Sequence, residues 1–254
     1  MRYLLTLALL TGVGLAAPAQ DIPDAAAVVR KAIAAHGGAD ALKAFGTSAS
    51  TVKGTMTVPG AELTFTSDLL FAAPDKLRLT LRTEVNGLKL EMVQVMNGDA
   101  FAQTSNGKAD TIDAAQKAEI RQAVVAQDVA TLVPLLTDKY ALKASADEKI
   151  GGDVANVLTA TPTAKGTEAR PVTLYFDAKT GYLVRYVREA LAPAEGGVPK
   201  KVKEDTKLAD FKKFDGAMIA TSAVATHDGK PFMAVTVTAV KALPMIDAKE
   251  FAVP

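Results

Sequence analysis

The first stretch of regularly spaced apolar residues predicts a helix near the start of the chain. Within residues 24–36, DAAAVVRKAIAAH, the apolar side chains that recur at the intervals of one helix face are Val28, Val29, Ala32 and Ile33. Asp24 stands where a side-chain cap is favoured, and Gly37 stands where helices commonly end in a left-handed residue. We expect a helix over 24–36, followed by a short helical turn over 39–45.

A second helical pattern occupies residues 111–136. Asp113 is followed three positions later by Gln116, which is the arrangement of a capping box. The residues that then recur at helical spacing are Ile120, Ala123, Val124 and Gln127. Pro134 limits any single helix to the residues before it, so two helical pieces are expected.

Between and after these helices the apolar period changes to two, which indicates strands. Leu63, Phe65, Leu69 and Phe71 alternate with polar neighbours. Turn dipeptides such as Asn97-Gly98 and Asp228-Gly229 separate further strand-like runs, which are 100–105, 154–160, 172–176, 182–189, 208–214, 218–226 and 232–242. The polar run 192–207 is expected to form a long solvated connection.

The clearest strand pair is residues 76–98, because Asn86-Gly87 is a strong signal for a two-residue hairpin turn. Such a turn places Val85 opposite Leu88. One face of the hairpin is then mostly apolar and consists of Leu77, Leu79, Leu81, Val85, Leu88, Leu90, Met92 and Met96. The other face pairs opposite charges, Glu84 with Lys89 and Arg82 with Glu91, and each pair is worth about 0.2–1 kcal/mol.

An apolar sheet face of this length must be buried against something. One possibility is that the helices pack on it and form an ordinary filled core. The other is that sheet and helices enclose a space for an apolar ligand, as some β-barrels do. The periodicity alone favours the filled core, because small barrels usually fill their interiors with side chains.

The first twenty residues, MRYLLTLALLTGVGLAAPAQ, have the pattern of a cleavable signal peptide. Arg2 precedes a short apolar run, and Ala17-Pro18-Ala19 supplies the cleavage pattern. We expect residues 1–19 to be removed after Ala19, export to the periplasm, and a single domain over 20–254 with no transmembrane anchor. Without Arg2 the chain is formally neutral, so it has no overall field that would attract nucleic acid.

Residues suited to catalysis or metal binding are sparse. The chain has no cysteine and two histidines, His36 and His227, which excludes cysteine ligands and a multi-histidine metal site within one chain. We assign His36 to the last turn of the first helix, where a partly charged ring would suit the helix dipole. A hydrolase that uses Ser105 or Ser222 with His227 stays open, although no spacing supports it. No catalytic residue, cofactor or metal is expected.

Seven short motifs are spread over nearly the whole chain after the leader: AHGGADALKAF, TVKGTMTV, LLFAAPDKLRLTL, VMNGDAFAQ, LYFDAKTGYLVR, LADFKKFDGAMIATS and VTVTAVKALPMIDAKEFAVP. In order and spacing they resemble the outer-membrane lipoprotein-sorting group, the periplasmic LolA carriers and their LolA/LolB-like relatives. The resemblance implies an α+β, mainly β fold. It would be an incomplete antiparallel β-barrel wrapped around helices, with an N-terminal helix.

The resemblance also implies a function, that of a monomeric periplasmic carrier. It would shield a lipid, or the acyl chains of a lipoprotein, in a hydrophobic half-barrel cavity without covalent chemistry. The expected lining residues are Phe65, Phe71, Leu77, Leu79, Leu81, Val85, Leu88, Leu90 and Met92, with Ile120 and Val124 from a lid helix. In some carriers an arginine near the cavity helps to control the lid. Arg78 is a candidate, although the hairpin register places it on the polar face. The alternative is an envelope sensor or protein-interaction module with a filled core.

Overall fold

One curled antiparallel sheet makes up most of this computed structural model, which describes residues 24–58, 60–164, 170–192 and 199–253. The predicted signal peptide, residues 1–19, lies outside the described residues. The strands are β1 (Thr47–Val58), β2 (Ala61–Ala72), β3 (Lys76–Val85), β4 (Leu88–Asn97), β5 (Ala100–Ser105), β6 (Lys108–Ala109), β7 (Tyr140–Ile150), β8 (Asp153–Pro162), β9 (Val172–Asp177), β10 (Leu183–Ala192), β11 (Lys200–Phe214), β12 (Ala217–His227) and β13 (Lys230–Ala242). Their order is β6-β5-β4-β3-β2-β1-β13-β12-β11-β10-β9-β8-β7. Because β6 and β7 form separate edges, the sheet is an open, incomplete barrel, and the predicted mainly β fold is confirmed.

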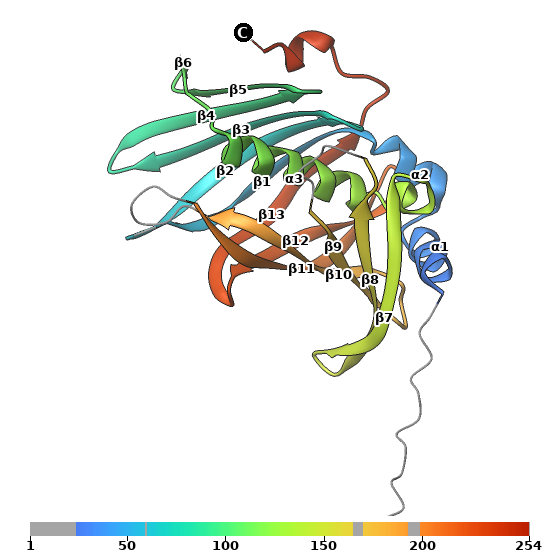
Figure 1. Cartoon of the computed structure of the whole chain (residues 1–254). Coiled ribbons are helices and arrows are strands. Elements are labelled where there is room, and N and C mark those ends of the chain that lie inside the picture. The colour runs from blue at the N-terminus through green and yellow to red at the C-terminus, as the bar shows by residue number, and fades with distance from the viewer. Residues whose placement is uncertain (1–23, 59, 165–169, 193–198, 254) are drawn as a thin grey trace, which may run out of the picture.

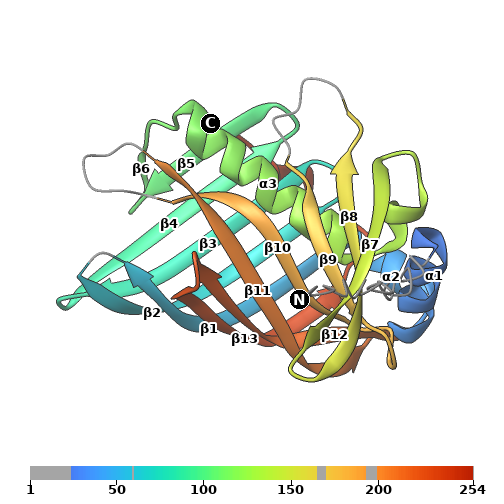
Figure 2. The same ribbon diagram turned by 60° about the horizontal axis from the view of Figure 1, so that its bottom comes forward.

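The sheet curls around helix α3 (Ala114–Ala130), which lies inside it between the wall β1–β6 and the wall β7–β10 (Figures 1 and 2). The pairing of β1 with β13 joins the two halves of the sheet. At this join a Cβ atom on Gly54 would collide with the carbonyl oxygen of Ala234, so glycine is needed for the close approach of the two strands. The face of the sheet toward α3 is its inner face.

The predicted helices are confirmed with their caps. The Asp24 side chain accepts a hydrogen bond from the Ala26 amide at the start of α1 (Ala25–Ala35), and Gly37 beyond its end has φ +102°. Helix α2 (Ala39–Ala44) follows. Both hydrogen bonds of the Asp113–Gln116 capping box are present at the start of α3, at 2.8 and 2.9 Å. The second helical piece after α3 is the 3₁₀-helix η1 (Val133–Leu136), which contains Pro134.

The predicted hairpin is also confirmed, residue for residue. Strands β3 and β4 pair with Val85 opposite Leu88 and Glu84 opposite Lys89. Arg82 lies opposite Glu91, and its Nε atom donates to the Glu91 carboxylate at 2.8 Å. Asn86 and Gly87 both have positive φ, as the tight turn requires.

Two predictions about the strands were wrong or incomplete. Residues 200–207, expected in a solvated connection, form the first half of β11. Their exposed lysines gave a polar composition, but the intervening Val202, Glu204 and Thr206 are buried on the inner face. Strand β7 was not predicted, because its sequence, YALKASADEKI, offers small and charged residues with few large apolar ones.

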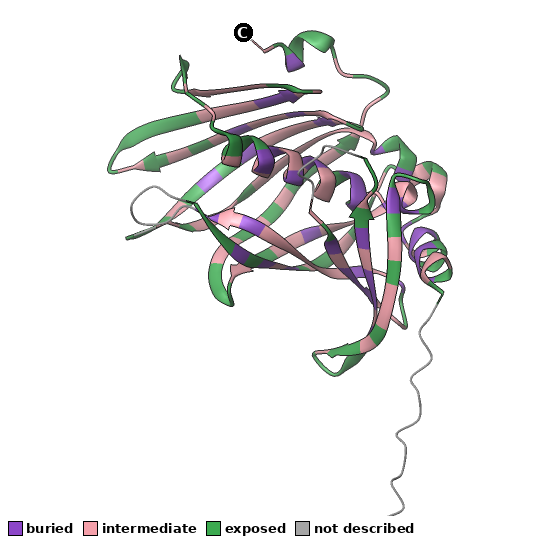
Figure 3. Cartoon of the chain, in the orientation of Figure 1, coloured by how far each residue is buried: buried purple, intermediate pink, exposed green. Residues whose placement is uncertain are grey.

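Among the described residues, the two largest clusters of buried residues lie on the inner side of the sheet, and Figure 3 colours the ribbon by burial. The larger cluster fills one end of the barrel, where α1, α2 and η1 pack against β7–β9. Its fully buried members include Val29, Leu42, Leu132, Leu135, Leu158, Leu174 and Phe176. The second cluster joins α3 to β2, β3 and β4. Three of the eight residues of the predicted apolar hairpin face, Leu77, Leu79 and Met96, therefore lie in or against an ordinary core.

Candidate functional site

The predicted cavity residues nearest the base of the hairpin are packed against α3. Phe71, Leu77, Ile120 and Val124 form one cluster with Met96, and each is at most 5% exposed. Leu79 packs against this cluster, and Phe65 is buried farther along β2. The structure therefore brings the expected lid residues onto the expected sheet face, with side chains filling the space between them.

The remaining predicted residues form a distal apolar face, defined as Leu81, Val85, Leu88, Leu90 and Met92. These residues lie toward the tip of the β3–β4 hairpin, which extends past α3 (Figure 1). Leu81, Val85 and Met92 are half-buried, whereas Leu88 is 69% and Leu90 42% exposed. The apolar surface thus continues outward from the α3 cluster into solvent at Leu88 and Leu90.

The opposite side of α3 is held by a chain of partly buried charges, of which Glu204 is fully buried. Glu119 pairs with Arg170 just before β9, and its other oxygen accepts from Arg188 of β10 at 3.2 Å. The Arg188 guanidinium also forms two hydrogen bonds with Glu204 of β11, at 2.6 and 3.1 Å. His227 lies 3.2 Å from Glu204 at the end of this chain. Burial alone would lower the pKa of Arg188, but the neighbouring carboxylates outweigh it and raise that pKa.

Two further polar contacts fix α3 along its length. The buried Gln122 side chain bridges the backbone of Arg170, accepting from its amide at 2.8 Å and donating to its carbonyl at 3.1 Å. Near the end of the helix, the Tyr140 hydroxyl donates to Asp128 at 2.9 Å, and burial together with this carboxylate raises the pKa of Tyr140. Helix α3 therefore presents an apolar side to β2–β4 and a hydrogen-bonded polar side to β7, β9 and β10.

Sequence reasoning missed this charged network. The available signal was one charged residue at an inward position of a two-residue period, Glu204 between Val202 and Thr206. Its partners Arg188 and Glu119 lie on other elements, far away in the sequence. Recognising the network needs the strand order, which the local pattern does not contain.

The two histidines occupy separate structural positions. His36 caps α1, is 5% exposed and contacts the rings of Tyr182 and Phe211. Its assignment to the helix end is confirmed, but the expected partial charge was wrong, because burial lowers the pKa of its ring. His227 stacks on Phe232 with ring centroids 3.7 Å apart.

The structure brings neither candidate serine to His227. Ser222 lies five residues before His227 on the same extended strand, and the alternation of that strand puts it on the opposite face. The Ser105 hydroxyl donates to Asp110 at 2.6 Å. Among the residues that the structure describes, no group of three or more His, Asp or Glu side chains could hold a metal ion.

Arg78, the candidate lid arginine, lies on the outer face of β3. Its guanidinium donates to the main-chain carbonyl of Glu250 at 3.1 Å, on the side of the sheet away from α3. The polar-face position implied by the hairpin register is confirmed. Arg78 thus contacts the C-terminal segment of the chain.

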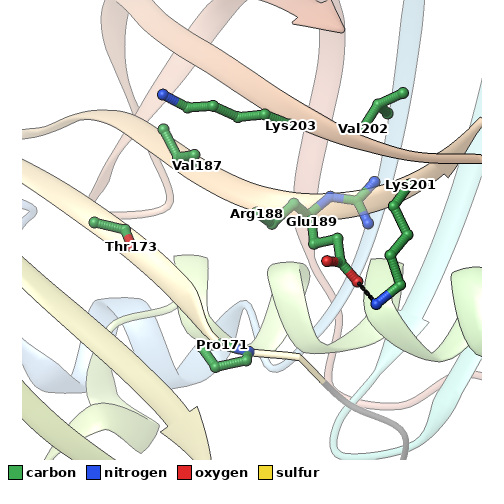
Figure 4. Close-up of a pocket in the computed structure, with 8 residues that line it drawn as sticks. All are labelled: Pro171, Thr173, Val187, Arg188, Glu189, Lys201, Val202 and Lys203. Atoms are coloured by element: carbon green, nitrogen blue, oxygen red, sulfur yellow. Dashed lines mark ion pairs between the residues drawn. The ribbon is translucent and has the colours of Figure 1, made fainter. Parts of the chain in front are cut away.

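Two hollows in the described part of the chain lie away from most of the predicted residues. One, of about 340 Å³, is lined by Pro171, Thr173, Val187, Arg188, Glu189, Lys201, Val202 and Lys203 (Figure 4). The Glu189–Lys201 ion pair, 3.0 Å long, lies in its wall. The other, of about 440 Å³, is lined by Lys53, Gly54, Thr55, Thr64, Phe65, Ser222, Ala223, Val224, Ala234, Val235 and Thr236. Phe65 is the one predicted residue in either lining.

The overall fold has clear counterparts among solved structures. A LolA superfamily protein from Nitrosomonas europaea superposes with a TM-score of 0.60 and 13% identity, covering 90% of this chain and 97% of that one. The chain has a LolA-like fold. A putative outer membrane lipoprotein-sorting protein domain from Vibrio parahaemolyticus has a TM-score of 0.52 at 12% identity, covering 89% and 94% of the two chains. A DUF1329 family protein from Desulfovibrio piger has 0.57 at 13%, covering 90% and 97%.

Sequence comparison adds no closer relative of this LolA-like chain. No protein-family model matches it, and no curated protein does either. At 12–13% identity the structural likeness shows the fold alone, so the predicted LolA-like architecture is confirmed and a function does not follow from it. Within the described ranges, no helix has both the length and the apolar character needed to cross a bilayer.

Proposed function

We propose that this LolA-like chain is a monomeric periplasmic binding protein that shelters the acyl chains of a lipid or lipoprotein and performs no covalent chemistry. The observation that carries the proposal is the distal apolar face, which continues from the α3 cluster but is left uncovered at Leu88 and Leu90. The lipoprotein-sorting description of the Vibrio parahaemolyticus structure supports the same role.

In this proposal α3 is a movable cover. Its apolar side, Ile120 and Val124, occupies the sheet face next to the distal apolar face. An acyl chain that enters along Leu90 and Leu81 replaces these contacts as α3 moves outward. Burial of each methylene is worth about 0.8 kcal/mol, so a long chain gains about 10 kcal/mol before association costs. Contact area alone is sufficient to drive such binding.

The test is binding of a fluorescent fatty acid to the wild type and to two matched variants. Leu90→Asp puts a charge under the acyl chain and is expected to weaken binding by at least about tenfold. Leu136→Asp is the control, because Leu136 is also 42% exposed but lies on η1, away from the distal apolar face. Equal affinity of both variants, or no binding by the wild type, would contradict the proposal. Mass spectrometry of protein purified gently from periplasm should also show a co-purifying lipid.

A second candidate function is a protein-interaction module with a filled core. It is favoured by the α3 cluster, in which Phe71, Leu77 and Met96 are buried by neighbouring protein side chains. A pull-down from envelope extract that recovers one stable protein and no lipid, together with no fatty-acid binding, would support this role over the carrier role.

A further inference from the structure

The chain contains three Asn-Gly dipeptides, and each of them lies at the end of a strand. They are Asn86-Gly87 between β3 and β4, Asn97-Gly98 between β4 and β5, and Asn106-Gly107 between β5 and β6. Asparagine loses its side-chain ammonia most readily when glycine follows it, because glycine has no Cβ atom to shield its main-chain nitrogen. The local sequence does not distinguish the three sites, but their contacts do.

The loss of ammonia is a hydrolysis that proceeds through a cyclic imide. The glycine N–H gives up its proton to hydroxide, the nitrogen bonds to Cγ of the asparagine, and the Cγ–Nδ2 bond breaks, so that ammonia leaves. Water then opens the imide. Breaking the new N–Cγ bond gives aspartate, and breaking the bond from nitrogen to the main-chain carbonyl carbon gives isoaspartate, whose main chain is one carbon longer. Attack therefore needs a glycine nitrogen that is not donating to an acceptor, and an asparagine side chain that is free to turn toward it.

Asn97-Gly98 is held at both reacting groups. The Gly98 amide donates to the carbonyl of Asp75 at 3.1 Å. Nδ2 of Asn97 donates at 3.3 Å to the carbonyl of Phe251, in the 3₁₀-helix η2 (Ala248–Phe251). Both residues of the dipeptide are half-buried. Attack at this site would break both hydrogen bonds.

Asn106-Gly107 is held through its asparagine. Oδ1 of Asn106 accepts from the Glu91 amide at 2.8 Å, and the Asn106 amide donates to the Glu91 carbonyl, also at 2.8 Å. These two hydrogen bonds fix the side chain against β4, although both residues of the dipeptide are exposed. The side-chain hydrogen bond must therefore break before Cγ can turn toward the Gly107 nitrogen.

Asn86-Gly87 is held at neither reacting group. Within the described part of the chain, the Asn86 side chain makes no hydrogen bond and the Gly87 amide has no acceptor. Both residues are exposed, and a Cβ atom on Gly87 would meet no heavy atom within 4 Å. They form the tip of the β3–β4 hairpin, which extends past α3 (Figure 1). The two groups can therefore approach each other without breaking a hydrogen bond of their own.

We propose that Asn86 is a self-modification site: attack by the Gly87 nitrogen converts it to aspartate or isoaspartate in the folded protein, while Asn97 and Asn106 stay as asparagine. The site lies between Val85 and Leu88, at the tip of the distal apolar face. Aspartate suits the same turn and places a carboxylate beside that tip. Isoaspartate lengthens the two-residue loop by one main-chain carbon, so the turn that pairs Val85 with Leu88 loses its geometry. The modification therefore alters the hairpin tip irreversibly, whatever the face binds.

The experiment follows all three sites in one sample. The intact protein is incubated in mildly alkaline buffer, digested at acid pH and analysed by peptide mass spectrometry with fragmentation that separates aspartate from isoaspartate. Asn86 should convert at least about tenfold faster than Asn97 and Asn106, because each of these must first lose a hydrogen bond. The protein unfolded in urea is the matched control, in which the three dipeptides should convert at similar rates. In Asn86→Gln, the acidic form that accumulates in the wild type should be absent on isoelectric focusing.

Two results would overturn the proposal. The first is conversion of Asn86 in the folded protein that is no faster than that of Asn97 or Asn106. The second is the same ratio of rates in the folded and the urea-unfolded protein, because the ranking would then come from the local sequence and not from the contacts.

The effect on the turn is tested by hydrogen exchange on the isoaspartate form, separated by chromatography. Its β3 and β4 amides near the tip should exchange faster than those of Asn86→Asp, which carries the same charge on a main chain of normal length. Equal exchange in the two forms would show that the turn tolerates the extra carbon, and would refute the proposed change in the hairpin tip.

Discussion

Glu119 links α3 to the barrel wall through two arginines, and its replacement by glutamine removes the charge while keeping the size of the side chain. The Glu119 side chain is 22% exposed, and its partners Arg170 and Arg188 are 17% and 13% exposed. A hydrogen bond to a charged group at such a site is worth about 1.5–3 kcal/mol. Arg188 keeps Glu204, whereas Arg170 loses its carboxylate, so we expect Glu119→Gln to destabilise the docked position of α3 by about 2 kcal/mol.

Native-state hydrogen exchange resolves this effect, because it reports local opening separately from global unfolding. A loss of about 2 kcal/mol corresponds to exchange of α3 amides about 30-fold faster, with β12 amides much less affected. The control is Glu91→Gln, which removes an exposed carboxylate 2.8 Å from Arg82. Exposed pairs contribute about 0–1 kcal/mol, so this variant should leave α3 unchanged.

The result that would refute the reasoning is equal protection of α3 amides in Glu119→Gln, Glu91→Gln and the wild type. In that case the apolar side of α3 alone would hold the helix in the barrel. The same variant also tests α3 as a cover, because Glu119→Gln should accelerate binding of a fluorescent fatty acid. An unchanged association rate with faster exchange would show that α3 opens without exposing a ligand site.

Three further perturbations follow from the packing and the charges. Ile120→Ala should lower the free energy of unfolding, measured by urea denaturation, by about 2–5 kcal/mol, because Ile120 is 5% exposed in the α3 cluster. A loss below about 1 kcal/mol would mean that the cluster is loosely packed. Gly54→Ala should destabilise the join of β1 and β13 by backbone collision with Ala234, and a Tm equal to the wild type would contradict that geometry. The hydrogen bonds from Arg185 lower the pKa of Asp205 in the folded state. This pair therefore stabilises the fold at pH values above the ordinary carboxyl pKa of about 3.9, and the stabilisation is lost as the pH falls through the lower pKa of the folded state. Asp205→Asn should therefore flatten the decline of Tm below about pH 4, and an unchanged slope would assign that decline to other carboxylates.

The parts of the fold that were predictable from sequence are those set by neighbouring residues. Asn86-Gly87 and the flanking alternation determine the β3–β4 register, and Asp113 with Gln116 determines the start of α3. These signals act over a few residues, so a single sequence contains them in full. The apolar face of the hairpin was predicted for the same reason.

The candidate site was only partly predictable, because coverage by another element is not a local property. Leu77 and Leu88 both lie on the apolar inner face of the hairpin. However, Leu77 is 4% exposed and Leu88 is 69% exposed. The difference arises because α3 packs over Leu77 but does not extend over Leu88. Likewise, Glu204 is buried because Arg188 lies beside it, and the polar composition around it led to the wrong prediction of a solvated connection.

The pairing of β1 with β13 has a consequence for how the chain folds. Strands β1 to β5 can form from consecutive hairpins, and so can β7 to β13, but the contact that unites them joins residues 47–58 to residues 230–242. Closing so long a loop is slow, because the chain loses conformational entropy before the hydrogen bonds between β1 and β13 form and compensate for that loss. We expect two independently nucleated half-sheets during refolding, with β1–β13 zippering as the rate-limiting step. Until that step, the facing edges of β1 and β13 are unpaired and open to intermolecular pairing.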